Sequence, residues 1–477
     1  MRQSWNQLRQ SAAVKTINAF LRKPIYIIFL AMVSALGSVF ALDLVTYTVM
    51  IVVAVYLCLL GEDLLPLIPV AILCYISPSW GNNPGRNPES IFYPQHGGIY
   101  LIVLASVFLC SLIFRMTMDK EIGGKAFFKA ERKLLGGMLV LGAGYLLSGI
   151  GLAEYGSLAG KNLLFAFLQF VAVTGMYYLF TGTVKWENAP KNYLAWTGVC
   201  VGFVVMAQLL ENYCSGRLFE YADGVLTINR YNIATGWGMH NNVGGLMAAM
   251  VPFCFYLACR EKRGWIFNLL AIVLMVGVVM SFSRSSMLMG GLAFALCAAI
   301  LLTRFDKGRK NLVIYGVAAA AAVLAVVIFR EKIMDLLSKF ISEDLFQVNS
   351  RDDLIVKGLT QFKNNPIFGG SFFPRVYVWD WSDVDAFSSF FPPRWHNTII
   401  QVLASCGVVG MAAYAFHRFQ TVKLLCTQRS REKLFVAVYL GVLLGTSLLD
   451  CHFFNVGPTM VYSIVLAFAE KIELSKE

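Results

Sequence analysis

The sequence predicts an all-α, polytopic integral membrane protein with about 12–14 transmembrane helices. Of the 477 residues, 57% are hydrophobic and only 14% are charged, and the mean hydropathy is +0.63, outside the range of soluble globular domains. Apolar windows long enough to cross a bilayer recur along the whole chain. The net charge of +12 fits either a nucleic-acid partner or basic cytoplasmic loops, and the placement of the charges decides between them.

The apolar windows that match the roughly 17–25 residues of a membrane span give about fourteen candidates. They begin near residues 24, 44, 64, 99, 134, 163, 193, 243, 265, 286, 311, 397, 433 and 455. With a cytoplasmic N-terminus and alternating sides, most of the 40 Lys and Arg residues fall in cytoplasmic segments. The positive-inside rule therefore predicts cytoplasmic N- and C-termini, and it explains the net charge without nucleic acid.

This topology places most of the unusual polar residues on the outer face. Among the five histidines, only His417 is expected on the cytoplasmic side, next to the basic segment that Arg418 begins. The outer face receives the turn Ser283-Arg284-Ser285, the long loop 330–396, and the histidines His96, His240, His396 and His452.

The long loop is expected to contain two helices and an aromatic segment. Apolar residues recur with helical spacing over residues 333–341, which predicts an amphipathic helix on the membrane surface or over a cavity. Ser350 is expected to be the N-cap of a second helix, which Asn364-Asn365-Pro366 ends. The aromatic stretch 367–393 fits either an interfacial belt or a lid that contacts sugars and lipid.

Two outer arginines are candidate anion ligands. Arg284 must stay at the membrane boundary or reach into a water-filled cavity, and its neighbouring serines would help it to bind phosphate oxygens. Arg351 falls in the first turn of its predicted helix, where the helix dipole disfavours a cation unless an anion is near. Snorkelling of Arg284 and a simple salt bridge of Arg351 are the alternatives.

His396 is the candidate general base. It precedes a predicted membrane helix, so the helix dipole and Arg394 both favour the neutral imidazole, which is able to accept a proton. A histidine bonded only to backbone is the alternative. His240-Asn241-Asn242 and Asp450-Cys451-His452 are further outer clusters, each also consistent with an ordinary helix start.

The sequence contains no nucleotide-phosphate loop, no HExxH, no GxSxG and no Asp-rich metal motif. We therefore expect neither a metal nor another cofactor.

Three outer motifs resemble, in order, those of the O-antigen ligase-like membrane proteins, a family that includes O-antigen ligases and polysaccharide polymerases. His396-Asn397, followed after nine residues by Gly407-Val408-Val409-Gly410, is similar to the family's His-Asn-x9-Gly-x-x-Gly signature. Asn349-Ser350-Arg351 with Asn365-Pro366-Ile367-Phe368-Gly369 resembles its arginine helix and Pro-x-x-Gly turn, and Ser283-Arg284-Ser285 resembles its outer arginine. The match covers roughly residues 240–415. It departs from the family at Ser405, where an acidic residue is frequent, at Gly370, where the second turn glycine is displaced, and at Leu354 or Ile355, where Trp is common.

The resemblance divides the chain into N-terminal transmembrane helices, residues 1–242, and an O-antigen ligase-like region, residues 243–477. It implies a metal-independent glycosyltransferase at the outer face of the cytoplasmic (inner) cell membrane. The donor would be an undecaprenyl-pyrophosphate-linked oligosaccharide, and the acceptor a hydroxyl of a glycan, lipid or protein. Arg284 and Arg351 would bind the pyrophosphate, His396 would deprotonate the acceptor and Asn397 would position it. Secondary site candidates are His240, Asn241, Arg394 and His452.

Two other classes stay open. A transporter or flippase for a polyprenyl-linked glycan would carry ionisable residues or broken helices near the midplane, and internal repeats. The predicted spans are nearly free of charge and show no repeat. A structural subunit whose outer loop only binds a partner would tolerate replacement of Arg284, Arg351 and His396.

Overall fold

The computed structural model describes residues 2–79, 97–152, 155–222, 225–305, 348–373, 394–427 and 431–471, with four isolated positions between 306 and 347. The described chain is almost entirely helical. Its strands form one antiparallel hairpin, β1 (Phe219–Ala222) and β2 (Val225–Ile228), in which Phe219 pairs with Ile228. The predicted all-α membrane class is confirmed.

The first part of the chain forms a series of mostly apolar helices. Their bounds are α1 (Arg2–Arg9), α2 (Ala12–Leu21), α3 (Pro24–Val39), α4 (Asp43–Leu60), α5 (Leu67–Ile76), α6 (Gly98–Met118), α7 (Gly124–Lys129), α8 (Leu135–Leu146), α9 (Tyr155–Phe170), α10 (Met176–Thr183) and α11 (Tyr193–Cys214). A π-helical turn joins α9 to α10, so that Gly160–Thr183 is one span. Helices α2 and α3 meet at 71°, with Pro24 as the first residue of α3, where its missing N–H is not needed.

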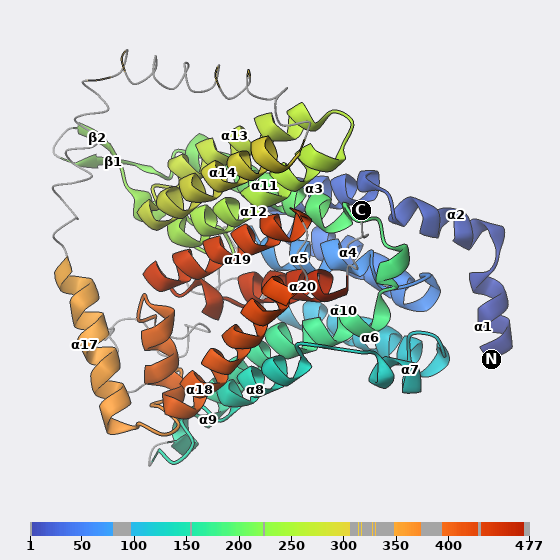
Figure 1. Cartoon of the computed structure of the whole chain (residues 1–477), viewed down its shortest axis with the longest axis horizontal. Helices are drawn as coiled ribbons and strands as arrows, with labels where there is room; N and C mark the ends of the chain where they lie inside the picture. Colours follow the sequence, from blue (N-terminus) through green and yellow to red (C-terminus); the bar gives the residue numbers. More distant parts are fainter. Residues whose placement is uncertain are drawn as a thin grey trace.

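The second part is built around one central helix. Its bounds are α12 (His240–Arg260), α13 (Gly264–Met280), α14 (Arg284–Arg304), α17 (Val348–Asn364), α18 (Thr398–Thr427), α19 (Arg431–Leu449), the short 3-10 turn η7 (His452–Phe454) and α20 (Val456–Lys471). Within the apolar window of α12, 94% of the residues are buried. Helices α11, α13, α14 and α19 surround it (Figure 1).

Seven described helices are long and apolar enough to cross a membrane, and an eighth span results if α2 and α3 are counted together. Helices α5, α8 and α13 and the segment Lys433–Leu449 of α19 are apolar but shorter. Every predicted span coincides with a helix except the one near residue 311, which lies outside the described residues. The predicted number of about fourteen spans therefore includes α5, α8, α13 and α19, which are shorter than the seven long helices.

Helix α18 is broken at Gly407, where φ is 63° and ψ is −161°. The break leaves backbone N–H and C=O groups without partners inside the helix, and the segment after α17 forms hydrogen bonds with them. The N–H of Gly370 donates to the carbonyl of Ala404 (2.7 Å), and the N–H groups of Val408 and Val409 donate to the carbonyls of Pro366 (2.8 Å) and Ile367 (3.2 Å). These bonds satisfy polar groups that would otherwise be exposed inside a membrane.

The helix extends past the residues where a cytoplasmic segment was expected to begin. Helix α18 continues to Thr427, so residues 418–427 are helical, and the side chain of His417 is fully buried in the protein. Arg418 lies 11 residues after Gly407, about 16 Å along the helix. The cytoplasmic side of this pair stays a prediction.

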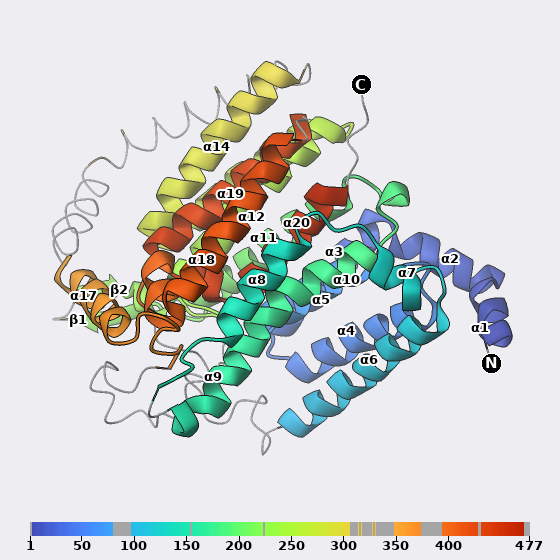
Figure 2. The same cartoon turned by 60° about the horizontal axis from the view of Figure 1, so that its bottom comes forward.

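Helix α17 lies beside the bundle, at the same end as the hairpin (Figures 1 and 2). It packs on the first half of α18 through Leu354, Trp395 and Ala404. It ends at Asn364, as predicted, but it begins at Val348, so Ser350 lies within the first turn and is not the N-cap. The amphipathic helix predicted over 333–341 and most of the aromatic stretch, residues 374–393, lie outside the described residues.

Candidate active site

His396 lies in the turn between the buried Trp395 and the start of α18, with a left-handed backbone (φ 50°). The next residue, Asn397, caps the helix: its Oδ1 accepts the N–H groups of Ile399 (2.9 Å) and Ile400 (3.2 Å). Its Nδ2 donates to the carbonyl of Leu448 (3.0 Å). Asn397 thus ties the start of α18 to the end of α19 and fixes the turn that holds His396.

The imidazole of His396 contacts the carboxylate of Asp450, with Nδ1 3.2 Å from Oδ1. Burial opposes ionisation of Asp450, but the contact with His396 and the neighbouring His452 and Arg394 outweigh burial. The pKa of Asp450 consequently lies well below its usual range. Nδ1 of His396 lies within ion-pair distance of this carboxylate but forms no hydrogen bond among the described residues, so the carboxylate favours a proton on Nδ1, with Nε2 as the acceptor, through its charge alone. About a third of the His396 side chain (36%) is exposed, so a substrate is able to reach it.

His452 adds a second imidazole close to Asp450. It is buried against α12, where an ideal Cβ on Gly245 would lie only 2.6 Å from its Nε2, so glycine is needed there. Burial lowers the pKa of His452, and the charge of Asp450 only partly opposes this effect. Its Nε2 has no hydrogen-bond partner among the described residues. His452 is therefore a neutral, packed ring at neutral pH.

Arg394 joins this turn to the start of α12. It donates from Nη1 to the carbonyl of Phe454 (2.8 Å) and from Nη2 to Oδ1 of Asn455 (2.7 Å). Asn455 in turn donates to Oδ1 of Asn242 in the first turn of α12 (2.9 Å). Burial lowers the pKa of Arg394. In the same first turn, His240 is buried and Asn241 is half-buried.

Arg284 is half-buried at the start of α14. The turn before it packs closely on α12, because an ideal Cβ on Gly244 would lie 2.3 Å from Oγ of Ser281. Gly244 faces this serine turn and its neighbour Gly245 faces His452. The Arg284 turn and the His396 group therefore adjoin the same first turns of α12.

Three helix N-termini gather at this end of the bundle: those of α12, α14 and α18. Gly445 of α19 packs on Met289 of α14, which puts the start of α14 beside the end of α19 and hence near Asp450. The positive ends of three helix dipoles, together with Arg284, favour an anionic ligand here.

The structure brings together His396, Asn397, Arg394, His452 and the first turn of α12 from the sequence-predicted set. Arg351 lies in the first turn of α17, but its side chain is outside the described residues, so its role stays a prediction. Asp450 was not singled out as a site residue. The available signal was an acidic residue two positions before a histidine in the short turn between the last two spans.

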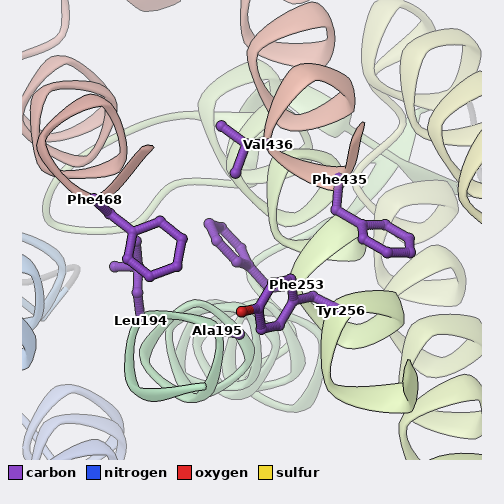
Figure 3. A pocket seen from close by; sticks show the side chains of 7 residues that line it. All are labelled: Leu194, Ala195, Phe253, Tyr256, Phe435, Val436 and Phe468. Atoms are coloured by element: carbon purple, nitrogen blue, oxygen red, sulfur yellow. The ribbon is translucent and has the colours of Figure 1, made fainter. Parts of the chain in front are cut away.

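A small apolar cleft lies elsewhere, between α11, α12, α19 and α20 (Figure 3). Its cavity volume is only about 10 Å³, and it is lined by Leu194, Ala195, Phe253, Tyr256, Phe435, Val436 and Phe468. Val436 is separated from Asp450 by most of α19, roughly 20 Å at 1.5 Å per residue. Typical ligand pockets span about 300–1,000 Å³ with a few polar groups, so this cleft does not fit a glycan site.

Residues 269–415 match the O-Antigen ligase protein family. The matched segment runs from α13 into α18, and it contains Arg284, His396, Asn397 and the break at Gly407. Asp450 and His452 lie beyond it. A comparison with curated proteins finds no match to the chain.

Proposed function

We propose, on the premise that this chain is an O-antigen ligase-like membrane protein, that it is a metal-independent glycosyltransferase of cell-surface polysaccharide assembly. It takes glycan from an undecaprenyl-pyrophosphate-linked donor and transfers it to, or polymerises it on, an acceptor hydroxyl. The observation that carries the proposal is the contact between His396 and Asp450, beside three helix N-termini and Arg284.

The reaction follows from these residues. Nε2 of His396 takes the proton of the acceptor hydroxyl, and the oxygen attacks the anomeric carbon of the donor glycan. The bond between this carbon and the pyrophosphate oxygen breaks, and its electron pair leaves with undecaprenyl pyrophosphate. Arg284 and the helix N-termini stabilise the negative charge that grows on the leaving group, and Arg351 would assist them. Asp450 stabilises the imidazolium that forms.

The site belongs on the outer face of the cytoplasmic membrane in this proposal. The positive-inside rule supports this side, because Lys and Arg are concentrated in the segments expected in the cytoplasm. The acidic and basic groups near the N-terminus, such as Arg9 with Asp119 and Arg22 with Asp63, belong to the cytoplasmic side of the same arrangement.

A transporter or flippase for a polyprenyl-linked glycan is the second candidate, and two observations favour it. Helix α18 is broken, and Arg418 and His417 lie inside the bundle, which the sequence had predicted to be nearly uncharged. Against it, two carbonyls beside the break already accept hydrogen bonds, that of Ala404 from Gly370 and Gln361 and that of Ser405 from Ser148, so they are not left to coordinate an ion.

The test replaces His396 by Ala and Asp450 by Asn in cells that otherwise lack the chain, and measures lipid-linked glycan on each leaflet together with finished polymer. General-base catalysis is worth about 100-fold to 10,000-fold in rate, so both variants should accumulate the donor on the outer leaflet while reaching normal membrane levels. Cys214→Ser, an exposed thiol at the end of α11, is the control and should behave as the wild type.

Each other outcome has a definite meaning. Accumulation on the cytoplasmic leaflet supports the transporter. Normal polymer from His396→Ala at a normal protein level contradicts the transferase site. With the site intact, a wild-type ladder of chain lengths built on the lipid identifies a polymerase, whereas transfer of whole chains to a different acceptor identifies a ligase.

A further inference from the structure

The bundle interior holds a cation that the proposed chemistry does not use. Arg418 of α18 is enclosed by three aromatic rings: its Cζ lies 4.3 Å from the ring centre of Phe453, 4.6 Å from that of Tyr414 and 5.0 Å from that of Tyr462. Its Nη1 donates to the hydroxyl of Tyr462 at 2.8 Å. Its Nε and Nη2 are buried without a hydrogen-bond partner in the described part of the chain, and no described carboxylate forms an ion pair with it.

The rings around Arg418 come from three separate elements. Tyr414 belongs to α18, Phe453 to η7 and Tyr462 to α20. Phe453 packs edge-on against Tyr462 (5.0 Å between ring centres) and against Tyr414 (6.1 Å). The hydroxyl of Tyr462 also lies 2.7 Å from Nε2 of His417. This aromatic box therefore locks α18, η7 and α20 together.

Phe453 is rigidly connected to Asp450. The N–H of His452 donates to the carbonyl of Asp450 (2.7 Å), and the N–H of Phe453 donates to Oγ of Ser447 (3.1 Å). The carbonyl of Phe453 accepts the hydroxyl of Thr459 at 2.5 Å. In so tight a turn, a displacement of Phe453 moves Asp450 as well.

His396 stands directly before the first half of α18, whereas Arg418 lies in the second half, beyond the break at Gly407. The contact of Arg418 with Phe453 therefore acts on the turn that carries Asp450 and not on the position of His396. A guanidinium in an apolar interior is stabilised chiefly by ring faces, and it stays charged where a lysine would lose its proton.

We propose that Arg418 is a positioning residue of the transfer reaction: held in the box of Tyr414, Phe453 and Tyr462, it keeps Asp450 within contact of His396. This inference rests on the proposed function. It assigns Arg418 no contact with donor or acceptor, and therefore predicts an effect on the maximal rate and not on donor affinity.

The test is a double-mutant cycle between Arg418→Met and Asp450→Asn in membranes of cells that express the full chain. The donor is the lipid-linked glycan extracted from cells that lack the chain. Arg418→Met should lower the maximal rate about tenfold and leave the half-saturating donor concentration unchanged. In the Asp450→Asn background the same change should lower the rate less than about twofold, because the residue through which Arg418 acts is already lost. Arg418→Lys should not recover the rate, because a lysine in this interior would lose its proton and no longer bind the ring faces as a cation.

Arg304→Met removes an exposed positive charge at the far end of α14 and serves as the control. An equal loss in both backgrounds, or no loss at all, overturns the role of Arg418. If Arg418→Met does not reach the membrane, the cycle is run with Phe453→Leu, which removes the ring but keeps the cation, and the same outcomes apply. A normal rate for Asp450→Asn alone contradicts the proposed function, whereas a slow Asp450→Asn with additive losses contradicts only this inference.

Discussion

Gly407 offers the most direct test of how the signature motif works. Its backbone (φ 63°, ψ −161°) lies in a region that only glycine adopts readily, and forcing another residue there costs about 1–3 kcal/mol. An ideal Cβ would also lie 2.4 Å from the carbonyl oxygen of Ile367 and 2.6 Å from that of Pro366. Both oxygens must move, which weakens two buried hydrogen bonds at about 1–3 kcal/mol each if they are left unsatisfied. Gly407→Ala should therefore destabilise the protein by about 4 kcal/mol, a large part of the 5–15 kcal/mol typical of folded proteins.

The assay is thermal unfolding of the detergent-purified chain, followed with a thiol-reactive dye that reports buried cysteines such as Cys254 and Cys406 as they become exposed. Gly291→Ala in α14 is the matched control, because its Cβ would meet nothing within 4 Å and alanine favours the helix by about 0.5–1 kcal/mol. Gly407→Ala should melt far below the wild type, and transfer should fall with the amount of folded protein. A Gly407→Ala protein that melts with the wild type and transfers glycan normally would refute the structural role.

Three further predictions concern the site. Arg284→Ala should raise the donor concentration needed for half-maximal rate and lower the maximal rate. Arg284→Lys should bring both quantities part of the way back to the wild-type values. Kinetics with extracted lipid-linked glycan measure both. Asn397→Asp should keep the cap on α18 but lose the donor to the Leu448 carbonyl, so it should slow the reaction through a misplaced His396. Asn397→Ala should do the same and also lose about 1 kcal/mol of stability from the cap in thermal unfolding; equal stability of the two variants would contradict the capping role. Because the pKa of Asp450 is lowered on folding, its stabilising effect is present above the unfolded pKa of about 4 and is lost as the pH falls toward the lower folded pKa. The melting temperature of the wild type should therefore exceed that of Asp450→Asn at about pH 5, and the difference should shrink below about pH 4.

Much of the fold was readable from the sequence, because the bilayer requires long apolar helices and their composition shows them directly. The end of α17 was also readable, since Asn364-Asn365-Pro366 is a local stop signal. The break in α18 was not, because Gly407 stands in an uninterrupted apolar run. Contacts with Pro366–Gly370, Gln361 and Ser148, all distant in the chain, make a non-helical backbone stable there.

The candidate site was likewise predicted only in part from the sequence. Local motifs pointed to His396 and Arg284, but the pairing of His396 with Asp450 joins residues far apart in the chain and has no spacing signal. Asn397 was expected to position the acceptor, yet an asparagine directly before a helix is among the preferred N-caps, and its amide makes those bonds here. Arg418 was assigned to a basic loop because charge near the end of an apolar run reads as a boundary, and nothing local reveals three rings from other elements.

The hydrogen bonds between the turn after α17 and the break in α18 have a consequence for biogenesis. The first half of α18, from Thr398 to Gly407, is too short to cross a bilayer, for which about 20 residues are needed. Backbone groups beside the break bond to Pro366, Ile367 and Gly370 and to the side chains of Ser148 and Gln361, all of which the ribosome has already made when Gly407 emerges. The half-helix therefore becomes stable only once it packs on segments made before it. For this reason, chimaeras between related chains should tolerate exchange of residues 366–370 and α18 as a pair better than exchange of either one alone.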